Sequence, residues 1–180
     1  MDFILLKNFF ADYSLPTVII ALTVGVGCFF ANKFLKNKIP QFVLLVAPFA
    51  LSIIFYFAYD MIFVSKAFVF SSDALIAGLL CGSLSTIVKS AVLRISKGKP
   101  LPVSATVLLI ENIISGYVTD AYQTAVSLEN LINEDKALEE QCDAIANVIK
   151  LNADKNISED ELTVITTLII QAVKTLKGKK

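Results

Sequence analysis

Two long stretches without a charged residue constrain the fold more than any other feature of this chain. They cover residues 13–32 and 39–59 and are twenty and twenty-one residues long. A helix needs about 20 apolar residues to cross a hydrocarbon layer about 30 Å thick. A third stretch, after Asp73, is uncharged for only fifteen residues. It reaches spanning length if the Lys89 side chain snorkels to the membrane surface, or if the span begins earlier, in residues 67–72, with Asp73 near the outer interface. We therefore predict three membrane-spanning helices, at about residues 13–32, 40–60 and 73–92.

The charged residues that flank these spans predict the orientation of the chain. The segments after the first and third spans are basic and contain no acid: Lys33, Lys36 and Lys38, then Lys89, Arg94, Lys97 and Lys99. Basic segments stay on the cytoplasmic side of a membrane. Residues 1–12 are then a short extracytoplasmic segment, and everything after the transmembrane region (residues 13–95) is cytoplasmic. The composition is compatible with a bacterial source, so the expected location is the bacterial inner (cell) membrane.

Residues 96–103 contain Gly98, Pro100 and Pro102 and are predicted to be a linker to a helical cytoplasmic region, residues 104–180. Apolar or small residues recur at steps of three and four along the first part of this region, which predicts one amphipathic helix over about 104–131, weakened at Gly116 by about 1 kcal/mol. A second helix is expected at about 135–151. Ser158 and Glu161 have the spacing of a capping box and predict the start of a third. No strand pattern competes, so the predicted fold class is all-α.

The sequence contains no recognisable catalytic or metal-binding motif. It has no histidine, no phosphate-binding or nucleophile motif, and three cysteines (Cys28, Cys81 and Cys142) too far apart for a CxxC pair. Asn152, Asp154 and Asn156 fit the first, third and fifth positions of a calcium loop, but the required glycine is missing and Thr163 falls at the twelfth position. We expect a polar turn there, no cofactor and no enzymatic activity. Residues 101–180 carry twelve acidic against seven basic residues, which disfavours nucleic-acid binding.

Small residues at four-residue steps predict helix contacts within the membrane. One such row lies in the third span and a shorter one in the first: Ala74, Gly78, Gly82 and Thr86, then Ala21 and Gly25. Small side chains let helix backbones approach closely in lipid. The partner helix can belong to the same chain or to a second copy, and both alternatives stay open. Asp60 and Asp73 are the acids beside the membrane region, and each is either an interfacial residue or a polar, proton-sensitive group.

The chain resembles the three-span class of phage holins in its predicted topology: three spans over Tyr13–Val92, an outside N-terminus and a cytoplasmic C-terminus. Its tail is also basic, with Lys174, Lys177, Lys179 and Lys180. The resemblance concerns topology and implies a homo-oligomer that permeabilises the membrane. The chain differs from that class in its long acidic helical region. Two alternatives remain: a membrane-anchored scaffold whose cytoplasmic helices oligomerise or recruit a soluble protein partner, and a small channel or transporter subunit.

Overall fold

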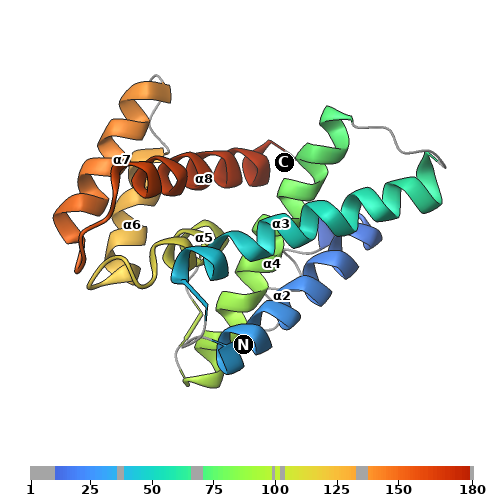
Figure 1. Ribbon diagram of the computed structural model, residues 1–180, viewed down its shortest axis with the longest axis horizontal. Coiled ribbons are helices and arrows are strands. Elements are labelled where there is room, and N and C mark those ends of the chain that lie inside the picture. Colours follow the sequence, from blue (N-terminus) through green and yellow to red (C-terminus); the bar gives the residue numbers. More distant parts are fainter. Residues whose placement is uncertain are drawn as a thin grey trace. The chain divides into compact units, whose positions relative to one another are not determined.

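The structure is a computed structural model and describes residues 11–35, 39–65, 71–98, 100–101, 104–132 and 138–178. These described residues contain seven α-helices, one π-helical turn and no named strand, which confirms the predicted all-α class (Figure 1). The chain divides into two compact units. Unit 1 is Met1–Leu101 together with Thr175–Lys180, and unit 2 is Pro102–Lys174.

Unit 1 contains the three predicted membrane-spanning helices, α2 (Leu15–Leu35), α3 (Gln41–Tyr59) and α4 (Ser72–Ser96). Each is long and apolar enough to cross a membrane. Figure 1 shows α2 and α4 running in one direction and α3 in the other, and α4 packs on both α2 and α3. Within the most apolar part of each helix, 78% of the residues of α4 are buried, against 28% in α2 and 22% in α3. α4 is therefore the central helix of this unit.

The second span continues beyond the limit predicted from the sequence. A π-helical turn, η1 (Asp60–Val64), follows α3 directly, and the Ser65 amide donates to the Asp60 carbonyl at 2.8 Å. The apolar stretch of this span is therefore Phe42–Val64 rather than 40–60. One acidic residue does not end a helix when apolar residues follow it. Asp60 is followed by four apolar residues with exposed side chains, Met61, Ile62, Phe63 and Val64.

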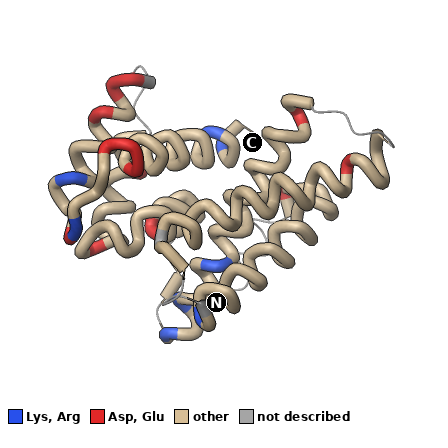
Figure 2. Tube along the Cα trace, viewed as in Figure 1, with Lys and Arg blue, Asp and Glu red and all other residues tan. Residues whose placement is uncertain are grey.

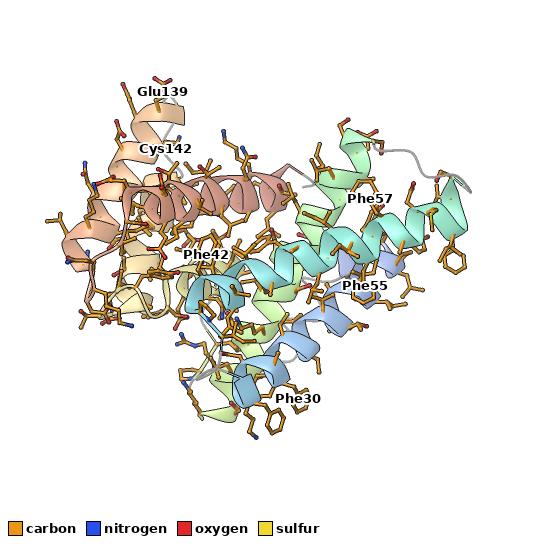
Figure 3. The ribbon with its side chains drawn as sticks, viewed as in Figure 1. Phe30, Phe42, Phe55, Phe57, Glu139 and Cys142 are labelled. Carbon is orange, nitrogen blue, oxygen red and sulfur yellow. The ribbon has the colours of Figure 1, made fainter. Side chains whose placement is uncertain are left out.

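The outer faces of α2 and α3 are apolar and uncovered in unit 1. Ile19, Phe30, Ile54 and Phe55 are exposed, and the Phe30 ring projects away from the neighbouring helices (Figure 3). Apolar side chains exposed along a helix of spanning length are suited to contact with lipid acyl chains. Figure 2 shows few charged residues along these three helices, as a hydrocarbon environment requires.

Unit 2 contains α5 (Ala105–Ile114), α6 (Ala121–Ile132), α7 (Leu138–Asn152) and most of α8 (Glu159–Lys177). Every helix contributes to the buried apolar side chains, among them Leu108, Ile113, Leu128, Ile145, Ile149, Ile165 and Ile169. The sequence prediction of one helix over 104–131 is wrong, because the chain leaves the helix between α5 and α6. Gly116 has φ +94°, a conformation that side chains with a Cβ rarely adopt. The apolar spacing continues through this turn because Tyr117 and Val118 are themselves buried.

Two loops of unit 2, the α5–α6 loop and the α7–α8 loop, are held together by backbone hydrogen bonds. The Thr119 amide donates to the Asn152 carbonyl at 3.1 Å, and the Asp154 amide donates to the Tyr117 carbonyl at 3.1 Å. The Lys155 side-chain nitrogen adds a long hydrogen bond to the Gly116 carbonyl, at 3.5 Å. The helix pairs α5–α6 and α7–α8 are thus tied at their loops, and the position of α7 and α8 depends on the turn at Gly116.

Candidate functional sites

The small-residue row of α4 lies against α3 of the same chain. A Cβ atom added to Gly78 would stand 2.8 Å from the Ile53 Cα, and one added to Gly82 would stand 2.8 Å from the Phe49 Cα. Real Cβ atoms do not approach another backbone that closely, so only glycine permits this distance between the two helices. The two glycines are therefore occupied by an intramolecular contact in this fold.

The other predicted packing residues lie on the same two helix interfaces or within α4 itself. A Cβ atom added to Gly25 on α2 would stand 2.7 Å from the Ser85 carbonyl oxygen of α4. Ala21 and Ala74 are buried. The Thr86 hydroxyl donates to the Gly82 carbonyl of its own helix at 2.9 Å, so its hydrogen-bonding capacity is used locally.

Lys89 joins α4 to α3, a role that differs from the one predicted from the sequence. It was expected to extend towards the membrane surface, but its side chain is only 5% exposed, and its nitrogen lies 3.5 Å from the Leu44 carbonyl oxygen of α3. The donor that a regular helix would offer this carbonyl is the amide of residue 48, and residue 48 is proline. Lys89 therefore donates to a carbonyl that the proline deprives of its helical partner, as polar groups of neighbouring helices do in membrane proteins.

A second polar contact joins α3 and α4 one turn away. The Ser52 and Ser85 hydroxyl oxygens are 3.0 Å apart, and both residues are buried. The Ser85 hydroxyl donates to the Cys81 carbonyl at 2.7 Å, so its single hydrogen is used and Ser52 is the donor between the two helices. Gly78, Gly82, Ser85 and Lys89, at steps of four, three and four, form the side of α4 that contacts α3.

The two acidic residues singled out from the sequence lie in different settings. Asp73 is exposed in the first turn of α4, where a carboxylate interacts favourably with the helix dipole. The Ser71 hydroxyl caps that turn by accepting from the Ala74 amide at 3.1 Å. Asp60 is half-buried at the start of η1, and apolar residues of the same span lie on both sides of it. The structure does not bring the two carboxylates together into one site.

The polar turn predicted at residues 152–158 leads into the predicted helix cap. The Ser158 hydroxyl accepts from the Glu161 amide at 3.2 Å, while a Glu161 carboxylate oxygen accepts from the Ser158 amide at 3.3 Å. This is the reciprocal arrangement of the predicted capping box. The carboxylate that could act as the last ligand of the loop is thereby engaged. Among the residues that the structure describes, no three potential metal-ligating side chains gather in one place.

The described part of unit 2 contains one groove with polar walls, between α7 and α8. Its volume is about 400 Å³, and it is open to solvent. Asp143 and Asn147 line it from α7, and Thr163 and Thr167 line it from α8. Cys142 of α7 also lines the groove and is half-exposed, whereas Cys28 and Cys81 of unit 1 are buried. The sequence pattern contains no signal for this groove, because the groove depends on how α7 and α8 are spaced.

One end of the groove contains an ion pair. The Lys150 side-chain nitrogen lies 2.8 Å from a Glu159 carboxylate oxygen, and both residues line the groove. Their side chains are 47% and 80% exposed, so solvent screens the attraction and the pair contributes little to stability. Its main consequence is local, because Lys150 neutralises Glu159 and leaves Asp143 as the uncompensated charge of the groove.

Comparison of the chain with protein-family models, with curated proteins and with solved structures finds no match in any of the three.

Proposed function

We propose that this chain is an integral membrane protein without enzymatic activity, in which α2–α4 form a closed three-helix anchor and unit 2 is a binding module held at the membrane. The observation that carries this proposal is the contact of Gly78 and Gly82 with α3. That contact uses the face of α4 best suited to recruiting a second copy. Unit 2, in contrast, has its own buried core and an open polar groove, as a recruiting module requires.

The proposed location is the bacterial inner membrane with unit 2 in the cytoplasm. Support comes from the basic residues Lys33 and Arg94 in the last turns of α2 and α4, two helices that end on the same side of the membrane in a three-span topology. Lys97, directly after α4, adds to the positive charge on that side.

Cys142 provides the experiment for this topology. A membrane-impermeant maleimide should label the full-length protein in inverted inner-membrane vesicles and leave it unlabelled in intact spheroplasts, because Cys142 is half-exposed and the other two cysteines are buried. Cys142→Ser is the control that should remove the label. Labelling in spheroplasts would contradict the cytoplasmic position of unit 2.

Membrane permeabilisation after self-association is the second candidate, in line with the resemblance to three-span holins. The observation that favours it is the apolar outer surface of α2 and α3, which a second copy could cover as well as lipid. Gly27 lies on that surface, and a Cβ atom added there would meet nothing within 4 Å. Under the anchor proposal, induced expression leaves the membrane potential intact. A rapid collapse of the potential would contradict the closed anchor and support permeabilisation.

A further inference from the structure

We propose that the groove between α7 and α8 binds a basic helical segment of a partner protein, with arginine or lysine side chains spaced four residues apart. This inference rests on the proposed function of unit 2 as a binding module and names the chemistry of its partner. The acidic charge of the unit and the arrangement of hydrogen-bond acceptors along the groove support it.

Unit 2 is strongly acidic. Its sequence contains twelve aspartate and glutamate residues against four lysines and no arginine. Figure 2 shows acidic residues on the first turns of α7 and at the start of α8, the two helices that form the groove. A negative potential of this kind attracts basic partners and accelerates their association.

The acceptors of α7 form a row at four-residue steps. Asp143 and Asn147 line the groove, and Glu139 precedes Asp143 by four residues on the exposed first turn of the helix (Figure 3). Side chains four residues apart on a helix lie about 6 Å from one another. A partner helix with basic residues at the same interval therefore places one cation at each carboxylate.

The opposite wall supplies small, uncharged side chains. Thr163 and Thr167 are four residues apart on α8 and exposed, and the Thr163 hydroxyl already donates to the Glu159 carbonyl at 2.8 Å. Among the described residues, neither the Asp143 carboxylate nor the Thr167 hydroxyl has a hydrogen bond or an ion pair. Both are free to accept hydrogen bonds from a guanidinium or ammonium group, and hydrogen bonds between charged groups are among the strongest in proteins.

The test uses the full-length protein in detergent micelles and a fluorescein-labelled, alanine-based peptide of fifteen residues with arginine at positions 4, 8 and 12. Fluorescence anisotropy should show saturable binding, and a peptide with glutamine at those three positions should not bind. Asp143→Asn should weaken binding about fivefold, the upper end for an ion pair at an exposed carboxylate. Thr167→Lys, which adds a second and unpaired cation to the groove at an exposed position, should abolish it.

Asp154→Asn is the matched control, because it removes the same charge from an exposed loop residue that does not line the groove. It should change the affinity less than twofold. Equal losses of affinity in Asp143→Asn and Asp154→Asn would show that general electrostatic attraction, and not the groove, binds the peptide. Displacement of the peptide by spermidine at an equal concentration of charge would show that the groove binds a small polyamine rather than a protein segment.

The peptide assay in micelles is independent of membrane orientation. Absence of peptide binding would overturn this inference alone, because the membrane anchor and its topology are measured separately by Cys142 labelling. Conversely, labelling of Cys142 from the outside would overturn the cytoplasmic position while the groove still bound the peptide.

Discussion

The side-chain nitrogen of Lys89 on α4 lies 3.5 Å from the carbonyl oxygen of Leu44 on α3, the carbonyl whose helical donor is removed by Pro48. Pro48 and Lys89 therefore contribute to the same hydrogen bond. Pro48 lacks the amide hydrogen that would bond to the Leu44 carbonyl within α3, and the Lys89 side-chain nitrogen of the neighbouring helix donates to that carbonyl in its place. The buried Lys89 side chain thus has a hydrogen-bond acceptor between two largely apolar helices.

A double-mutant cycle tests this arrangement. Pro48→Ala restores the amide that donates to the Leu44 carbonyl, so Lys89 is no longer needed there. We expect Lys89→Met to lower the free energy of unfolding by about 1 kcal/mol more in the native background than in the Pro48→Ala background, the usual size of a hydrogen bond between membrane helices. Unfolding in mixed micelles, followed by circular dichroism, provides the four free energies. A coupling of zero would show that the two residues act independently.

The close approach of α4 to α3 predicts different effects for two glycine substitutions. Gly82→Ala places a methyl group 2.8 Å from the Phe49 Cα, so the helices must separate, and we expect a loss of about 1–3 kcal/mol in the free energy of unfolding. Gly27→Ala is the matched control, because its Cβ meets nothing within 4 Å. It should leave stability unchanged or raise it slightly through helix propensity. Similar effects in the two variants would argue against a tight α3–α4 contact.

The sequence predicts the helices of unit 1 well, because the physical constraint is local. A span must be long and largely free of charge whatever its neighbours are, so composition alone locates α2 and α3. α4 also contains Lys89, so its limits follow less directly from composition. The partner of Gly78 and Gly82 could not be predicted in the same way. A small-residue row identifies a face that permits close approach, but not the helix that approaches it, and the choice between the same chain and a second copy needs three-dimensional contacts.

The sequence contains a signal for the buried position of Lys89, the proline at residue 48 in the second span. A proline inside a span leaves the carbonyl four residues earlier without its helical donor. A hydrogen-bond donor from a neighbouring helix is therefore expected near that carbonyl. The break at Gly116 had a weaker signal, because a Ser-Gly pair is typical of a turn but a single glycine is tolerated within a helix. Its flanking residues Ile114, Tyr117 and Ala121 keep helical spacing, and periodicity cannot distinguish a continuous helix from a turn whose side chains are also buried.

The turn at Gly116 predicts a loss of stability for a minimal substitution. Gly116→Ala forces a residue with a Cβ atom into φ +94°, and we expect a cost of about 1–2 kcal/mol. Ser115→Ala in the same turn is the control, because Ser115 has φ −62°, which alanine adopts freely. Thermal unfolding of the full chain measures the cost. The Thr119 amide, which donates to Asn152, should also exchange with solvent faster in Gly116→Ala, and unchanged exchange would contradict the link between this turn and the loop pairing.

Tyr117 predicts a pH dependence at the alkaline end. Its hydroxyl is buried without a hydrogen-bond partner among the described residues, and burial, with a smaller contribution from the Glu161 carboxylate, raises the pKa of Tyr117 above its usual value near 10. Because the folded state opposes ionisation, the free energy of unfolding is unaffected by this titration below about pH 10 and falls as the pH rises towards the folded-state pKa. Thermal unfolding should therefore show a steeper alkaline loss for the native protein than for Tyr117→Phe.

The same substitution has a second expected effect at neutral pH. Removing a buried hydroxyl that has no partner should leave stability unchanged or raise it by up to about 1 kcal/mol, since the desolvation cost of the hydroxyl disappears while the ring is retained. The measurement is the unfolding temperature of both proteins between pH 7 and pH 11. A clear destabilisation by Tyr117→Phe at pH 7 would mean that the hydroxyl has a stabilising partner, and parallel alkaline profiles would mean that Tyr117 ionises no less readily in the fold than in the unfolded chain.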